Sequence, residues 1–187
     1  MHDDVERILI TQQQIEQRVK QLAAQITADH TSATGADGEI TLLPILTGAM
    51  IFCADLMRYL PMRMQIGLLA VSSYPGRSVR SQGSQLLSEQ IGNVRGRHVL
   101  LVDDILDSGG TIQLVRSLVS EIEPASVKTC VLLRKDRPQA RAVPVDYVGF
   151  DIPDEFVVGY GLDYDDYYRN LPDIVTLKGR VISSRKA

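Results

Sequence analysis

Three carboxylates stand beside a glycine-rich turn in the segment HVLLVDDILDSGGTI, residues 98–112. Asp103 and Asp104 directly follow an apolar run, and Asp107 comes three residues later. The Ser-Gly-Gly-Thr turn at 108–111 can present hydroxyls and converging backbone N–H groups to an anion. Because carboxylates repel an anion, the segment predicts a ligand with two kinds of group: a phosphate for the turn, and hydroxyls with a metal ion for the acids.

The turn matches neither the G-x-x-x-x-G-K-[ST] phosphate loop nor the dinucleotide G-x-G-x-x-G. On the motif alone, a capped strand-to-helix turn without a ligand remains an alternative. The three histidines, His2, His30 and His98, are scattered, which argues against a histidine metal site or a Ser/His/Asp triad.

The composition indicates one α/β domain, since 187 residues with 44% apolar and 23% charged residues are ordinary globular values. A net charge of −3 argues against a broad nucleic-acid surface. Cys53 and Cys130 lie in apolar segments, which suits buried thiols in a reducing cytoplasm. No segment approaches the roughly 18 apolar residues of a membrane span, so we expect a cytoplasmic protein without membrane partners.

Apolar strands alternate with helical segments along the chain, and this pattern predicts a mostly parallel sheet covered by helices on both faces. Strands are expected at residues 39–46, 66–74, 98–102, 126–135 and 145–152. Helices are expected at residues 11–30, 49–60 and 111–123. The first helix starts at a Thr11 cap and has an apolar face of Ile15, Val19, Leu22, Ala23 and Ile26.

Two segments lack an apolar face. Residues 75–85, PGRSVRSQGSQ, read as a mobile surface loop that could act as a lid. The basic tail at 177–187 is expected to be frayed.

Three further segments join the acidic turn to give a resemblance to the type I phosphoribosyltransferases. The turn resembles their signature for phosphoribosyl pyrophosphate (PRPP), PILTGAMIFCADLMRYL at 44–60 their pyrophosphate loop, and AVSSY at 70–74 the entry to their flexible loop. VDYVGFDIPDEFVVGYGLDYDDYYRNLP at 145–172 resembles the purine-site and hood segment of hypoxanthine-guanine phosphoribosyltransferases. The resemblance implies one domain over 1–187, with a small hood from about 145–187 and part of the N-terminus.

The resemblance also implies a role for each matching residue. Asp107 is the acid or base at purine N7, and Asp103 and Asp104 hold the ribose hydroxyls. The residues implied to bind the 5′-phosphate are Ser108, Gly109, Gly110 and Thr111. The residues implied to bind pyrophosphate are Leu46, Thr47, Gly48 and Arg169, with a nonproline cis bond at Leu46-Thr47. The residues implied to bind the purine are Lys135, Phe156, Val157 and Asp163. The residues implied to bind Mg²⁺ are Asp103, Asp104 and Asp163, and the implied flexible-loop contacts are Ser73 and Tyr74.

One departure from the family pattern concerns charge. Thr47 stands where many members carry lysine, and Arg77 and Arg80 could compensate from the flexible loop. Without the resemblance, Lys135 would be read as a solvated charge and Asp163 as part of a solvated face.

The implied activity is transfer of the phosphoribosyl group of PRPP to hypoxanthine or guanine, in a homodimer or homotetramer. The alternative is a regulator on the same fold that senses PRPP or nucleotide and binds RNA. The acidic balance and the purine-site segment favour the enzyme. The sequence leaves open the preference among hypoxanthine, guanine and xanthine.

Overall fold

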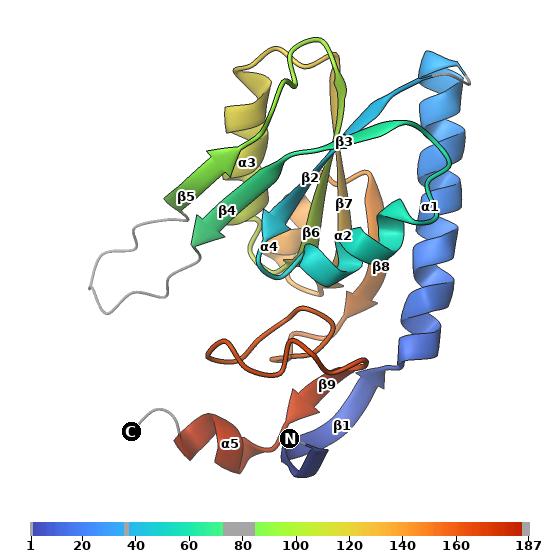
Figure 1. Ribbon diagram of the computed structural model, residues 1–187. Coiled ribbons are helices and arrows are strands. Elements are labelled where there is room, and N and C mark those ends of the chain that lie inside the picture. Colours follow the sequence, from blue (N-terminus) through green and yellow to red (C-terminus); the bar gives the residue numbers. More distant parts are fainter. Residues whose placement is uncertain (1, 36–37, 73–84, 185–187) are drawn as a thin grey trace.

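The computed structural model describes residues 2–35, 38–72 and 85–184 (Figure 1). A long helix, α1, runs beside a main sheet, and a small two-stranded sheet lies beyond one end of the main sheet. The strands are β1 Val5–Ile10, β2 Ile40–Leu46, β3 Met64–Ile66, β4 Leu68–Ser72, β5 Gln85–Gln90, β6 His98–Leu106, β7 Ser126–Lys135, β8 Tyr147–Ile152 and β9 Ile174–Leu177. The helices are a 3-10 turn at His2–Asp4, α1 Gln12–Thr34, α2 Met50–Met57, α3 Gly110–Ser120, α4 Pro138–Ala142 and α5 Gly179–Ser184.

The main sheet has the strand order β5-β4-β2-β6-β7-β8, with β3 also paired to β2. All of its pairs are parallel except β4 with β5. The predicted mostly parallel sheet is therefore confirmed. Parallel strands leave their carboxyl ends on one edge, and the loops at that edge are where open sheets of this kind bind ligands.

Alternate residues of the central strands fill two apolar layers, as the two-residue period of a strand requires. Leu42 and Leu100 pack with α1 and α2, whereas Leu43 and Leu101 pack with α3 on the opposite face. Helix α4 joins α3 over β7. Continuous apolar strands thus result from burial on both faces.

Helix α1 begins as the sequence predicts, because Thr11 and Gln14 form a capping box. The Gln14 N–H donates to the Thr11 hydroxyl at 3.3 Å, and the Thr11 N–H donates to the Gln14 side chain at 2.9 Å. The buried stripe of the helix consists of Ile15, Val19, Leu22, Ala23, Ile26 and His30. Arg18 donates to the carbonyls of Val148 and Gly149, which belong to the edge strand β8.

The single strand predicted at 66–74 is wrong, because the chain breaks at Gly67 into β3 and β4. A Cβ on Gly67 would lie 2.4 Å from both the Ile91 carbonyl oxygen and a Leu43 methyl carbon, so only glycine fits this close approach. Strand β5 was not expected, since residue 85 was assigned to the loop. The rest of that loop lies outside the described residues.

The frayed tail is also a wrong prediction for residues 177–182. Strand β9 pairs antiparallel with β1, from Val5 opposite Leu177 to Ile10 opposite Ile174. Val181 and Ile182 of α5 pack against the apolar cluster of this small sheet. Figure 1 shows the small sheet, α5 and the 153–173 loop beyond the carboxyl edge of the main sheet.

Cys53 and Cys130 are buried and free, as predicted. Burial raises the pKa of the Cys53 thiol to about 11, which keeps it protonated near neutral pH. Among the described residues, no helix combines the length and the apolar character that crossing a membrane would require.

Candidate active site

The predicted site residues gather at the carboxyl edge of the main sheet, where neighbouring strands deliver them in register. Pro44 of β2 lies opposite Val102 of β6, so the residues that follow place Leu46 beside Asp104. Leu106 of β6 lies opposite Arg134 of β7, so Asp107 and Lys135 come next to each other. The register therefore brings the pyrophosphate loop, the acidic turn and the lysine to one place.

The acid pair belongs to β6 rather than to the turn after it, which corrects the expected end of this strand at residue 102. Asp103 is only 5% exposed. Burial, followed by repulsion from Asp104, raises the pKa of Asp103 well above its ordinary value. Burial also raises the pKa of Asp104, opposed by hydrogen bonds to Asp103 and the Ile105 N–H and by the charge of Arg169. Hydroxyl donors or a cation bound here would offset this desolvation cost.

The loop after β2 approaches this pair closely. The Leu46-Thr47 bond is cis, as the resemblance implied. Gly48 lies against Asp104, because an added Cβ would be 1.8 Å from the Asp104 Oδ2 atom. Thr47 has an exposed side chain. Of the residues implied for pyrophosphate, Gly48 therefore lies directly beside the acid pair, and Leu46 and Thr47 precede it in the same loop.

The glycine turn starts α3, an eleven-residue helix whose N-terminus faces the same edge. Gly109 has φ +87°, and an added Cβ would be 2.3 Å from a Val143 methyl carbon, so both backbone and packing require glycine. Ser108 and Gly110 are exposed and Thr111 is half-buried. Exposed residues at a helix N-terminus are suited to an anion.

Asp107 and Lys135 are joined in a four-residue charge cluster. The Lys135 ammonium donates to Asp107 Oδ2 at 2.9 Å and lies 3.7 Å from Asp154 Oδ1. Arg137 completes the cluster, with Nη1 2.5 Å from Asp107 Oδ1 and Nη2 2.6 Å from Asp154 Oδ1. We define these four residues as the 107/135/137/154 cluster.

Arg137 and Asp154 were missed by the sequence reasoning. The available signal was spacing: Arg137 is two residues after Lys135 at the end of a strand, where alternate residues share a side. Asp154 similarly lies two residues past the end of the neighbouring strand β8. Nothing in the spacing, however, says that strands 17 residues apart in sequence meet at these positions.

The 153–173 loop brings the remaining purine residues. Phe156 is 46% exposed and contacts Tyr164 edge to face, with ring centroids 5.5 Å apart. Val157 is buried. Phe156 follows Asp154 of the charge cluster by two residues, and an exposed aromatic ring is a suitable platform for a flat heterocycle.

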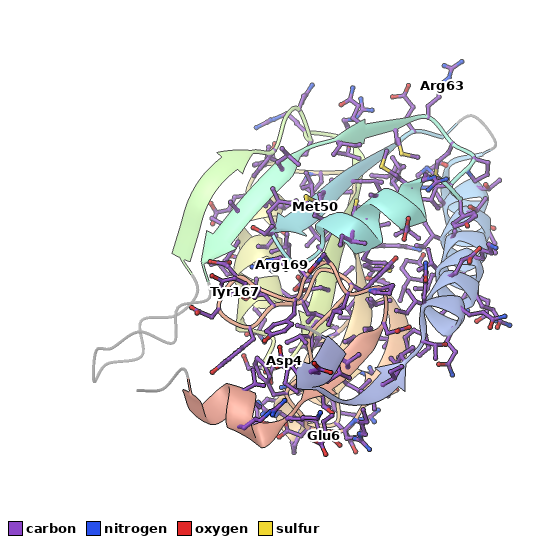
Figure 2. The ribbon with its side chains drawn as sticks, turned by 60° about the horizontal axis from the view of Figure 1, so that its bottom comes forward. Asp4, Glu6, Met50, Arg63, Tyr167 and Arg169 are labelled. Carbon is purple, nitrogen blue, oxygen red and sulfur yellow. The ribbon has the colours of Figure 1, made fainter. Side chains whose placement is uncertain are left out.

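Arg169 contacts three other residues of the 153–173 loop. Its guanidinium lies 2.9 Å from Asp163 Oδ1 and 3.0 Å from Asp166 Oδ1, and it donates to the Gly161 carbonyl at 2.8 Å. Gly161 in turn packs on the pyrophosphate loop, because its added Cβ would be 2.2 Å from the Gly48 carbonyl oxygen. Figure 2 shows Arg169 between Met50, at the start of α2, and the small sheet.

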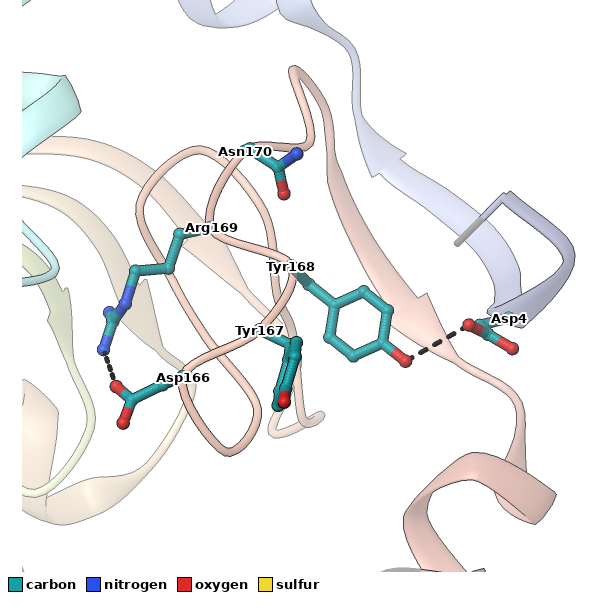
Figure 3. Close-up of a pocket in the computed structure, with 6 residues that line it drawn as sticks. All are labelled: Asp4, Asp166, Tyr167, Tyr168, Arg169 and Asn170. Carbon is teal, nitrogen blue, oxygen red and sulfur yellow. Dashed lines mark hydrogen bonds and ion pairs between the residues drawn. The ribbon is translucent and has the colours of Figure 1, made fainter.

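A cleft of about 580 Å³ opens on the outer side of this arginine. It is lined by Asp4, Asp166, Tyr167, Tyr168, Arg169 and Asn170 (Figure 3). Figure 3 shows Tyr168 pointing away from Arg169 to Asp4, with which its hydroxyl bonds at 3.2 Å. Arg169 is thus shared between this cleft and the predicted site.

The predicted flexible-loop contacts and the predicted metal ligands have different outcomes. Ser73 and Tyr74, with Arg77 and Arg80, lie outside the described residues. Within the described ranges, no three His, Cys, Asp or Glu side chains are grouped closely enough to hold a metal ion unaided. A divalent cation at Asp103 and Asp104 would therefore need ligands from a substrate or water, as is usual for Mg²⁺.

Known proteins resemble this chain over nearly its whole length. The family described as the phosphoribosyl transferase domain matches residues 6–165. The hypoxanthine-guanine phosphoribosyltransferase of Mycobacterium avium is 43% identical, over 95% of this chain and 88% of that protein. The enzyme of the same name from Streptococcus pneumoniae is 39% identical, over 98% and 99%. Trypanosoma cruzi hypoxanthine phosphoribosyltransferase, solved with the product IMP, has a TM-score of 0.88 at 35% identity, covering 100% of this chain and 97% of that one.

These similarities agree with the fold and with the resemblance carried by the motifs. They extend well beyond the acidic turn, over 95% and 98% of this chain. The type I phosphoribosyltransferase fold is thereby confirmed. The chain belongs to the phosphoribosyltransferase family and, within it, to the hypoxanthine-guanine phosphoribosyltransferases.

Proposed function

We propose that this chain transfers the phosphoribosyl group of PRPP to hypoxanthine and guanine, giving IMP or GMP and pyrophosphate. The observation that carries the proposal is the contact between Asp107 and Lys135, which come from two strands and meet at 2.9 Å beside the glycine turn. A carboxylate and an ammonium in this arrangement match N7 and the 6-oxo group of a purine. The IMP complex of the Trypanosoma cruzi relative supports the same product class.

PRPP would lie along the carboxyl edge of the sheet. Residues 108–111 bind its 5′-phosphate at the start of α3, and the carboxylates of Asp103 and Asp104 accept hydrogen bonds from the ribose hydroxyls. The 46–48 loop donates to the pyrophosphate, with Arg169 as the cation. The close contact of Gly48 with Asp104 supports a sugar and a pyrophosphate bound side by side.

The purine would lie between the cluster and the 153–173 loop. Lys135 donates to its 6-oxo oxygen, Phe156 stacks on its ring, and the Val157 carbonyl and Asp163 face the edge that carries the 2-amino group of guanine. The exposed ring of Phe156 and the burial of Lys135 support these roles.

The reaction breaks the C1′–O bond to pyrophosphate and forms the C1′–N9 bond. Early bond breaking gives C1′ cationic character, as in glycoside cleavage. The chain contributes by holding base and sugar in line, which can supply a large part of the acceleration. Asp107 takes the proton from N7 as N9 attacks, so that the product base is neutral.

Mg²⁺ fits this site as a ligand shared with PRPP. Asp103 offers a buried carboxylate and Asp104 a half-buried one, and Asp163 would be a third ligand, provided that its ion pair with Arg169 opens. When bound, Mg²⁺ would offset the charge that develops on the departing pyrophosphate.

The same proposal extends to the organisation of the protein. We infer a single phosphoribosyltransferase domain over 1–187, with the small sheet, α5 and the 153–173 loop as its hood. We also infer a cytoplasmic homodimer or homotetramer that binds small molecules rather than nucleic acid. The alternative of an RNA-binding regulator has no support, because the relatives reported above are named as enzymes.

The proposal is tested by incubating the chain with hypoxanthine, PRPP and Mg²⁺ and quantifying IMP and pyrophosphate. Equal amounts of both products are expected. Retention of RNA together with no IMP above the enzyme-free blank would contradict the proposal and favour the regulator.

A further inference from the structure

Arg137 has no assigned part in the proposed reaction, although it contacts the residue that handles the proton. Its two terminal nitrogens reach different carboxylates, Nη1 to Asp107 at 2.5 Å and Nη2 to Asp154 at 2.6 Å. The guanidinium therefore bridges the acidic turn after β6 and the loop after β8. Each carboxylate takes a separate terminal nitrogen of the guanidinium, whereas the Lys135 ammonium reaches the same two carboxylates from one nitrogen, at 2.9 and 3.7 Å.

The local backbone explains why Arg137 faces the site. It precedes Pro138, the first residue of α4, and has extended dihedrals, φ −125° and ψ 142°. A residue before proline is restricted to such a conformation. Its N–H donates to the Lys135 carbonyl at 2.8 Å, which keeps the two cations adjacent.

The charges of the cluster balance, with two cations against two carboxylates. Lys135 is buried, its side chain only 8% exposed, and lies between Asp107 and Asp154. A purine brings a neutral oxygen, which has to compete with both carboxylates for the ammonium hydrogens. Arg137 reduces that competition because its guanidinium pairs with both carboxylates. Its contact also holds the pKa of Asp154 below the ordinary value.

We propose that Arg137, anchored by Asp154, is a positioning residue that pairs with Asp107 and Asp154 so that Lys135 is free to donate to the purine 6-oxo oxygen. This role rests on the proposed function. Without Arg137, two carboxylates would share one buried ammonium, and the purine would bind to a lysine that is held away from it.

The test is a double-mutant cycle of Arg137→Gln and Asp154→Asn, with Arg141→Gln as the matched control. Arg141 is a nearby exposed arginine that pairs with Asp136 and Asp151 outside the cluster. Arg137→Gln should raise KM for hypoxanthine about tenfold, with a smaller change in kcat, as expected for one lost charge-assisted contact.

Two further readouts separate positioning from general damage. The KM for PRPP should stay near the wild-type value in Arg137→Gln, because the lost contact lies at the purine rather than at PRPP. In the double variant the KM for hypoxanthine should be only about threefold above the wild-type value, because one cation, Lys135, again faces one carboxylate, Asp107. The Arg141→Gln control should retain the wild-type values.

A wild-type KM for hypoxanthine in Arg137→Gln, or a double variant whose KM is as high as that of Arg137→Gln alone, would overturn the inference. An independent arm needs no turnover: the ¹³C carboxyl signal of Asp154 should titrate at higher pH in Arg137→Gln than in the wild type. An unchanged titration would also overturn it. A wild-type chain that forms no IMP would instead refute the proposed function, so the two failures are distinguishable.

Discussion

Gly161→Ala should separate the 153–173 loop from the pyrophosphate loop. The new Cβ would lie 2.2 Å from the Gly48 carbonyl oxygen, whereas ordinary contacts begin near 3.4 Å, so the two backbones must part by about 1 Å. Gly161 also has φ +103°, a conformation that costs a residue with a side chain about 1–3 kcal/mol. A displacement of about 1 Å in a positioning element can cost about 10²-fold in rate.

The assay compares Gly161→Ala with Gly92→Ala. Gly92 also has positive φ, +72°, but an added Cβ there meets nothing within 4 Å. Both variants should lose stability in urea unfolding, because both acquire the backbone strain. Only Gly161→Ala should lose about 10²-fold in kcat/KM for hypoxanthine. If both variants keep the same kcat/KM, contact between the two loops does not position the substrates.

Three other changes test separate residues. Asp107→Asn should fold normally and lose about 10² to 10⁴ in kcat, and an unchanged kcat would remove Asp107 from proton transfer. Lys135→Ala should weaken purine binding by about 10-fold to 10²-fold while leaving the KM for PRPP nearly constant; equal losses for both substrates would contradict the base-pocket role. Burial, with a contribution from the neighbouring His98, lowers the pKa of His30, so the folded state favours the neutral ring. The stability contributed by the neutral His30 ring is fully present above about pH 6.5. As the pH falls through this value, the unfolded chain binds the proton first and the free energy of unfolding declines. Urea midpoints at about pH 7.5 and about pH 5.5 should therefore differ less in His30→Leu, and an equal difference would refute this account.

The parts of the fold that depend on local pattern were predictable. The Thr11 cap, the apolar face of α1 and the strand at 126–135 follow from residue spacing alone, and the structure has them at or near the expected bounds. The strand that starts at His98 was placed correctly at its beginning, but it continues through Asp103 and Asp104. Carboxylates usually mark a strand end, so the burial of Asp103 and the partial burial of Asp104 could not be predicted from the pattern.

The parts that depend on distant partners were not predictable. Strand β1 joins β9 across the whole chain, Val5 opposite Leu177, and the segment VERILI, with its adjacent Glu6 and Arg7, gives no sign of such a partner. The break at Gly67 follows from its close approach to Ile91, a contact that only the folded sheet creates. The cluster partners Arg137 and Asp154 were missed for the same reason, since their meeting depends on strand register.

Competition among hypoxanthine, guanine and adenine for PRPP tests the central claim most directly, because it reads the chemistry of the base pocket rather than the presence of a fold. Lys135 can only donate, so an oxygen at purine position 6 is accepted, whereas the amino group of adenine meets it donor to donor. The account predicts IMP and GMP at similar rates and discrimination against adenine of about 10⁴ or more. Formation of AMP at a comparable rate would contradict it.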